Sequence, residues 1–365
     1  MKLGFFSPLP PSPTGVADYS AALLRHMQKS GDVAPNSAGD INVYHLGNNH
    51  LHREIYARAL ADPGVVVLHD AVLQHFFLGT LTEPEYIEEF VFNYGEWTRG
   101  LARELWKNRA RSAADPRYFD HPMLKRVVSV SKGVIVHNPA AAAAVRAHGG
   151  TNVFEIPHLF LAPPLPSQAE VDTLRKARGV PPETLLAGVF GHLRESKRIP
   201  VILRAMQRLW GEGLDVRLLV QGEFSSSDLE RALRDQLRSP HILRAGYLEP
   251  TEFWKYAAAT DLCINLRYPS AGETSGIAIS MMGIQKPVIF TAGAEISRFP
   301  ENACLRVDLG PVEEDHLAGL IRWMASDRSA LSEIGSRAGA HVLAEHNADR
   351  IAQRFWEMLR EIKTR

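Results

Sequence analysis

The sequence has few of the features that mark secreted, membrane-spanning or metal-bound proteins. Its 365 residues include two cysteines, Cys263 and Cys304, which lie at no metal-ligand spacing. We therefore expect both to be small core residues in a reducing compartment, without a disulfide. No apolar run approaches the roughly 18 residues that span a bilayer. The N-terminal stretch is short and interrupted by prolines, so it is not a signal sequence and a cytoplasmic protein is expected.

An excess of charge of one sign is also missing. Lysine and arginine together number 41, as do aspartate and glutamate, so the chain has no overall field and nucleic acid is not an expected partner. Hydrophobic residues make up 45% and charged residues 22% of the chain, which is typical of a soluble globular protein. The length suits two domains, each with its own core.

Three ligand-binding motifs are absent. No Gly-x-Gly-x-x-Gly follows an expected strand, which argues against a dinucleotide oxidoreductase. No Asp-x-Asp occurs, so the metal ligand of many sugar-nucleotide enzymes is missing, and there is no phosphate-binding P-loop. Bound metals and cofactors are therefore not expected.

Short apolar runs alternate with helical patterns along most of the chain, which predicts parallel strands joined by helices. Strands are expected at residues 2–6, 41–46, 65–68, 133–136, 153–156, 185–190, 216–221, 242–245 and 262–266. A proline-rich stretch at 163–166 divides this series, so we place one domain at residues 1–162 and another at 167–345. The fold class predicted is α/β, with two Rossmann-like, doubly wound parallel-sheet domains that face a cleft.

The most informative segment is Gly-Glu-Thr-Ser-Gly at residues 272–276, between an expected strand and an expected helix. Unpaired amide groups at a helix N-terminus suit a phosphate, so Thr274, Ser275 and Gly276 are candidate donors to one. A carboxylate beside such a site, here Glu273, would accept hydrogen bonds from sugar hydroxyls linked to the phosphate. The alternative is that Glu273 only stabilises the first turn of its helix.

Positive charges follow the strand expected at 185–190. Lys197 and Arg194 lie in the loop after it, with His192 nearby, and such charges can offset a leaving diphosphate. A solvated basic loop is the alternative.

His69 and Asp70 directly follow the strand expected at 65–68, where His69 would protrude into the cleft. The alternatives there are a core histidine and, for Asp70, a helix N-cap.

These segments resemble the donor-binding signature of group 1, family 4-like retaining glycosyltransferases of the GT-B type. Glu273, the glycine-containing turn, the helix and Lys286-Pro287-Val288 follow that signature, and Lys197 matches the family lysine. The chain departs from the family in two places. His192 replaces an arginine, with Arg194 two residues on, and Ser280 and Met281 stand where a second glutamate would hold the ribose.

The resemblance implies roles for further residues. His69 would contact the donor hexose, and the backbone at Gly15 would approach the donor phosphate. Gly222, Tyr247 and Leu248 would flank the nucleobase. In the family the leaving phosphate itself deprotonates the acceptor, so neither a general base nor a metal is needed. The C-terminal helix, residues 346–365, would cross back to the N-terminal domain.

The interpretation is therefore a retaining, metal-independent glycosyltransferase with Glu273, Lys197 and His69 in catalytic roles. It would transfer a hexose from a nucleoside-diphosphate sugar to a hydroxyl acceptor bound by the N-terminal domain, in cell-surface polysaccharide or glycolipid synthesis. The alternatives are a nucleotide-sugar epimerase and a catalytically degenerate protein that binds a sugar nucleotide or a partner. The basic, amphipathic stretch 97–111 is interpreted either as a solvated face or as a weak peripheral contact with the inner face of the membrane.

Overall fold

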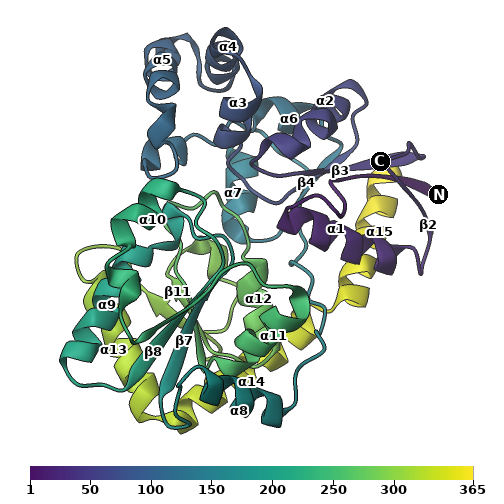
Figure 1. Ribbon diagram of the computed structural model, residues 1–365. Coiled ribbons are helices and arrows are strands. Elements are labelled where there is room, and N and C mark those ends of the chain that lie inside the picture. Colours follow the sequence, from purple (N-terminus) through teal and green to yellow (C-terminus); the bar gives the residue numbers. More distant parts are fainter. Residues whose placement is uncertain (365) are drawn as a thin grey trace.

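The computed structural model describes residues 1–364 and shows two lobes, each built around a six-stranded parallel sheet (Figure 1). The strand order of the N-terminal sheet is β2-β1-β3-β4-β5-β6, and that of the C-terminal sheet is β12-β11-β10-β7-β8-β9. The strands of the first sheet are β1 (Lys2–Phe6), β2 (Asp32–Pro35), β3 (Ile41–Leu46), β4 (Val65–Leu68), β5 (Gly133–Val136) and β6 (Val153–Glu155). Those of the second are β7 (Leu185–Phe190), β8 (Val216–Gln221), β9 (Ile242–Ala245), β10 (Leu262–Asn265), β11 (Val288–Thr291) and β12 (Leu305–Val307).

Helices connect these strands and cover both faces of each sheet. The N-terminal lobe contains α1 (Gly15–Met27), α2 (Arg53–Ala61), α3 (Gln74–Thr80), α4 (Glu83–Tyr94), α5 (Arg99–Lys107), α6 (Lys125–Val130) and α7 (Pro139–Ala147). The C-terminal lobe contains α8 (Gln168–Ala177), α9 (Ile199–Gly211), α10 (Ser227–Leu233), α11 (Pro250–Ala259), α12 (Gly276–Gly283), α13 (Glu313–Ser326) and α14 (Arg328–Glu345). The last helix, α15, runs from Ala348 to Thr364. The predicted fold class, two doubly wound parallel sheets, is confirmed.

The central strands are buried on both faces, which explains their continuous apolar sequences. All residues of β4 and of β7 are buried. Side chains of β4 point alternately into two hydrophobic cores, with Val66 and Leu68 on one face and Val65 and Val67 on the other. Cys263 and Cys304 are buried with free thiols, as predicted.

Three strands, β2, β11 and β12, were not predicted. The edge strands β2 and β12 are short, and β2 is exposed at both ends, so neither carries a long apolar signal. The third, β11, lies between β10 and β12 and directly follows Lys286-Pro287.

The helix α15 returns from the C-terminal lobe and lies beside α1 on the N-terminal lobe (Figure 1). Its residues Phe355 and Leu359 share a core with Leu23 of α1, and Trp356 Nε1 donates to the carbonyl of Met27 at 3.1 Å. The two segments that join the lobes also contact each other, since the amide of Phe160 donates to the carbonyl of His346 at 2.7 Å. The lobes are thus connected through paired chain crossings.

The basic stretch 97–111 forms α5 between two short 3-10 turns, and Trp97 just before it is 84% exposed. Arg99 is paired with Glu88 and Glu96, whereas much of the remaining basic face is open to solvent. Among residues 1–364, no helix combines the length and the apolar character that a membrane span requires. Peripheral contact with a membrane through this stretch stays a prediction.

Candidate functional site

The carboxyl ends of the two sheets face each other, and the turn at residues 271–274 touches the N-terminal lobe. The amide of Ala71 donates to the carbonyl of Ala271 at 2.7 Å, and Asn138 Nδ2 donates to the carbonyl of Gly272 at 2.9 Å. Gly272 has a φ of +72°, and a Cβ there would lie 2.9 Å from the Cβ of Ala71. Glycine is therefore required for the lobes to approach this closely.

The helix α12 begins directly after this turn. Ser275 caps it, since its hydroxyl accepts from the amide of Ala278 at 3.3 Å and donates to Asn265 Oδ1 at 3.1 Å. The amides of Gly276 and Ile277 lie in the first turn, where no preceding helical carbonyl is available to them. An anion at this end of α12 would meet both these donors and the positive end of the helix dipole.

Glu273 lies three residues before α12, outside its first turn, so stabilisation of the helix dipole does not explain it. One carboxylate oxygen accepts from the amide of Ala271 at 2.8 Å, and the other forms an ion pair with Arg267 Nη1 at 3.0 Å. Both side chains are about one-fifth exposed (19% for Glu273 and 20% for Arg267). The carboxylate is held in position and remains accessible. Arg267 was not predicted as a site residue.

Lys197 ends the short 3-10 turn Glu195–Lys197 after β7 and is buried, and its Nζ donates to the carbonyl of Phe190. Burial, with the positive charge of Arg267 as the next cause, lowers the pKa of Lys197 to about 7. Arg194 and His192 are exposed in the same loop. Burial and the charge of Arg194 lower the pKa of His192, so this imidazole does not supply the charge of the arginine that it replaces.

Asp70 lies opposite these charges at the end of β4. It is not a helix cap, because α3 begins only at Gln74, and its Oδ2 instead accepts from the amide of Asn48 at 2.8 Å. Burial and the negative charge of Glu273 raise the pKa of Asp70 to about 6, against the opposing effects of the Asn48 amide and of Arg194 and Arg267. Asp70 is therefore a second site residue that was not predicted.

His69 does not extend freely into the cleft. Its Nε2 lies 3.0 Å from Nδ1 of His45, and its ring packs edge-on against Tyr19 and near His137. Burial, followed by the neighbouring histidines, lowers the pKa of His69 well below its usual value. His158 also packs against Tyr19 and His137, so the end of the N-terminal sheet carries a cluster of neutral imidazoles.

The loops after β7, β8 and β9 meet around Gln221. This buried side chain accepts from the amide of Gly191 at 3.3 Å and donates to the carbonyl of Gly246 at 3.1 Å. Gly222 has a φ of +119°, and a Cβ there would lie 2.2 Å from the carbonyl oxygen of Gly191. The predicted nucleobase loops are thus brought together, and Tyr247 is 70% exposed beside them.

The other predicted donor contacts of this region can also be located. Leu248 is half-buried. Gly15 lies across the cleft, exposed at the start of α1, where Thr14 is the N-cap.

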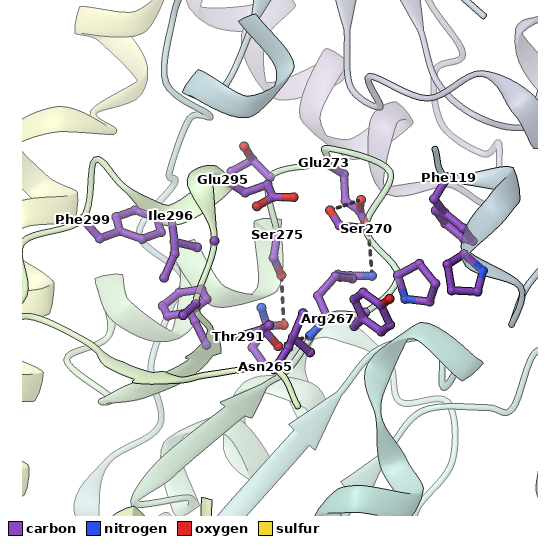
Figure 2. Close-up of a pocket in the computed structure, with 18 of the residues that line it drawn as sticks. Phe119, Asn265, Arg267, Ser270, Glu273, Ser275, Thr291, Glu295, Ile296 and Phe299 are labelled. Carbon is purple, nitrogen blue, oxygen red and sulfur yellow. Dashed lines mark hydrogen bonds and ion pairs between the residues drawn. The ribbon is translucent and has the colours of Figure 1, made fainter. Parts of the chain in front are cut away.

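Two cavities open beside the Glu273 turn. The first has a volume of about 330 Å³ and is lined by Glu273, Thr274 and Ser275, with Arg267 and Asn265 below them (Figure 2). Figure 2 places Phe299 and Ile296 at one end of this cavity and Phe119, from the N-terminal lobe, at the other. The second has a volume of about 480 Å³ and shares Thr274, Glu295 and Phe299 with the first. Lys197 and His69 line neither cavity.

Several solved structures match this arrangement over nearly the whole chain. The HepE protein of Anabaena, crystallised with UDP-glucose, superposes with a TM-score of 0.67 at 17% identity, covering 99% of this chain and 100% of HepE. Sucrose-phosphate synthase of Thermosynechococcus elongatus gives 0.71 at 14%, covering 99% of both chains. WaaG, a glycosyltransferase involved in lipopolysaccharide biosynthesis, gives 0.60 at 14%, covering 96% of this chain and 98% of WaaG.

The chain has the GT-B glycosyltransferase fold. No sequence-family profile and no curated protein sequence matches it. At these low identities the structural likeness establishes the fold, and the roles of individual residues depend on the geometry described above.

Within the GT-B cleft, the predicted residues fall into two groups. Glu273, Thr274, Ser275 and Gly276 form one continuous turn, and the charges of Glu273 and of Arg194 both act on the pKa of Lys197 in the β7 loop. Gly15 and His69 belong to the opposite lobe. Among residues 1–364 no group of three or more His, Cys, Asp or Glu side chains is arranged to hold a metal ion. Arg267 follows β10, Asp70 follows β4, and Gln221 is the last residue of β8. These positions at strand ends were the signal that could have identified the three residues.

Proposed function

We propose that this protein is a retaining, metal-independent glycosyltransferase that moves a hexose from a nucleoside-diphosphate sugar to a hydroxyl acceptor. The observation that carries the proposal is the position of Glu273. Its carboxylate is fixed by Arg267 and the Ala271 amide, borders a cavity, and stands three residues before the amide-rich end of α12. A sugar phosphate needs both an oxygen acceptor for hydroxyls and an anion site, and this turn offers the two together.

Each part of the donor matches the chemistry of one group of residues in the cleft. Its hexose would lie against Glu273 in the first cavity, and its diphosphate against the amides of Gly276 and Ile277. Its nucleobase would lie near Gly222 and Tyr247, whose loops are joined through Gln221. HepE, which has the same fold, was crystallised with UDP-glucose, and this supports a donor of the same class.

Transfer would depend on neutralising the charge that develops on the leaving diphosphate. Lys197 and Arg194, in the loop after β7, would supply the positive charge that neutralises it. The approach of a diphosphate would favour the protonated form of Lys197. The acceptor oxygen would bond to the anomeric carbon on the face that the diphosphate leaves. The acceptor proton would pass to the departing phosphate oxygen, so no carboxylate needs to act as a base.

The N-terminal lobe would contribute to the binding of the acceptor and help to exclude water. Its contacts through Ala71 and Asn138 close the cleft over the Glu273 turn. His69 would offer a neutral hydrogen-bonding group to the hexose, as the family resemblance implies. The proposed setting is cell-surface polysaccharide or glycolipid synthesis on the cytoplasmic side, and the likeness to WaaG supports it.

One observation favours a second candidate, a nucleotide-sugar epimerase. Burial and the charge of Glu273 raise the pKa of Asp70 to about 6, and a carboxyl with a pKa near neutrality suits acid–base chemistry on a sugar. The absence of the second family glutamate is compatible with a third candidate, a protein that binds a sugar nucleotide without turnover. The three candidates differ in their products.

A two-step experiment separates them. Thermal-shift measurements with nucleoside diphosphates and their hexose conjugates should identify a donor that raises the melting temperature more than its diphosphate alone. With that donor, acceptor-dependent release of nucleoside diphosphate indicates a transferase. A changed sugar without release indicates an epimerase, and binding with neither indicates a degenerate protein. If no compound shifts the melting temperature, the proposal is contradicted.

A further inference from the structure

The second cavity is formed jointly by the two lobes and by the chain crossing that joins them. The N-terminal lobe contributes His137, Asn138, Glu155 and Pro157. The C-terminal lobe contributes Thr274, Glu295, Arg298, Phe299, His341 and Glu345, and the crossing and α15 contribute His346 and Arg354. Its volume of about 480 Å³ lies within the range of small-molecule sites.

The charges that line this cavity leave one carboxylate unpaired. Arg298 forms an ion pair with Glu155 at 3.0 Å, and Arg354 forms one with Glu345 at 3.5 Å. Over the described residues 1–364, the carboxylate of Glu295 forms no ion pair and accepts no hydrogen bond. Two arginines and three glutamates therefore leave a net charge of one negative unit, because the histidines are neutral at pH 7.

The neutral state of these histidines follows from their surroundings. Burial lowers the pKa of His137 and of His346 to about 4, and burial is also the largest cause of the lowered pKa of His341. The ring of Phe299 packs at 5.6 Å, centroid to centroid, from His341 and at 6.0 Å from His346. The lining thus combines hydrogen-bond donors, hydrogen-bond acceptors and an aromatic ring, and it contains no unpaired cation.

Glu295 occupies the junction with the first cavity. It lines both cavities, together with Thr274 and Phe299, and Figure 2 shows it beside Ser275 on the side away from Phe119. A group bound in the second cavity would therefore lie next to a hexose held at Glu273. This is the position that an acceptor must occupy before transfer.

We propose that the second cavity binds the acceptor as an uncharged saccharide, with Glu295 accepting hydrogen bonds from its hydroxyls. This inference rests on the proposed glycosyltransferase function. Sugar hydroxyls use both the guanidinium donors and the carboxylate acceptors of the lining, and the apolar face of a sugar ring suits Phe299. A phosphate or carboxylate on the acceptor would face an unpaired carboxylate with no free cation, which costs affinity.

The test is an acceptor panel used with the donor that the thermal-shift screen identifies. The panel contains p-nitrophenyl glycosides of neutral hexoses and disaccharides, p-nitrophenyl glucuronide and a hexose 6-phosphate glycoside. Release of nucleoside diphosphate is measured for the wild type, for Glu295→Gln and for the control Glu301→Gln. Glu301 lies on the same connection before β12 but is 92% exposed and outside both cavities.

We expect a neutral glycoside to be the best acceptor. Its KM should rise about tenfold in Glu295→Gln and stay unchanged in Glu301→Gln. The dissociation constant of the donor should be the same in all three proteins. Preference for an anionic glycoside, an unchanged KM in Glu295→Gln, or no acceptor activity across the panel would overturn the inference. Because donor binding is measured separately, its loss in the wild type would instead contradict the proposed function.

Discussion

The two lobes share one architecture but differ in the chemistry at their strand ends. In the C-terminal lobe the loops after β7 and β10 carry the charged side chains Arg194, Arg267 and Glu273, together with Lys197, whose pKa is about 7. In the N-terminal lobe the corresponding ends of β3, β4 and β5 carry neutral imidazoles, namely His45, His69 and His137, and the carboxyl of Asp70 follows β4. A GT-B scaffold thus separates a lobe suited to an anion from a lobe suited to hydroxyl groups.

Burial contributes to this difference in both lobes. It lowers the pKa of each imidazole in the N-terminal cluster, and neighbouring histidines lower the pKa of His45 and His69 further. In the C-terminal lobe burial also lowers the pKa of Lys197, to about 7, but an incoming diphosphate would restore its charge. The comparison therefore predicts that substitutions in the charged lobe affect donor chemistry more than substitutions in the imidazole cluster.

The largest expected effect is on turnover in Lys197→Met. Loss of a charge that acts on the leaving diphosphate should lower kcat by about 100- to 1000-fold, as for other groups that stabilise developing charge. Folding should change less, because the substitution leaves one buried carbonyl, that of Phe190, without its donor, at a cost of about 1–3 kcal/mol. Steady-state kinetics and thermal unfolding measure the two effects.

Lys286→Met is the matched control. Lys286 is half-buried and also donates to a backbone carbonyl, that of Ala258, at 2.8 Å, but it precedes β11 and lies at the opposite end of the strands from the cleft. The turnover of Lys286→Met should match the wild type. Equal losses of turnover in the two variants would show that the Lys197 charge has no more effect on turnover than that of a lysine outside the cleft.

The second effect concerns the close packing of the donor loops. In Gly222→Ala the new Cβ would overlap the Gly191 carbonyl oxygen, and the positive φ would add strain, so stability should fall by about 3 kcal/mol. Gly213 also has a positive φ, of +81°, but open space for a Cβ, so Gly213→Ala should cost about 1 kcal/mol. Denaturant unfolding measures the difference. Equal losses of stability in the two variants would show that the loops at Gly191 and Gly222 can move apart without a cost in free energy.

The third effect is a pH dependence of donor use. The charged form of Lys197 is populated below its pKa of about 7 in the free enzyme. The kcat/KM for the donor, which reports on the free enzyme, should therefore fall up to about tenfold per pH unit above 7. This limb should be absent in Lys197→Met. A flat profile for the wild type from pH 6 to 9 would show that the lysine charge is not required.

Much of the fold could be predicted from the sequence because β4 and β7 are continuous apolar runs, and such runs identify central parallel strands. The edge strand β2 could not be predicted, since its pairing with β1 and not its own sequence defines it. The Glu273 turn was identifiable from its two glycines and the helix that follows it.

The partners of the site residues were harder to predict, because they come from distant parts of the chain. Arg267 lies close to Glu273 in the sequence, but the ion pair between them depends on how the turn folds back. The proximity of Asp70 to Glu273 depends on closure of the two lobes, and no local pattern records it. His69 was interpreted as a cleft residue, and its contacts with His45 and Tyr19 could not be predicted because they depend on the packing of β3, β4 and α1.

Calorimetric titration of wild type and Glu273→Gln with a nucleoside diphosphate and with its hexose conjugate tests the central claim most directly. If Glu273 binds the sugar, the substitution should weaken binding of the conjugate by about tenfold and leave binding of the diphosphate alone unchanged. Equal affinities of the two proteins for the conjugate, or equal losses for both ligands, would contradict the role of this carboxylate in holding the hexose.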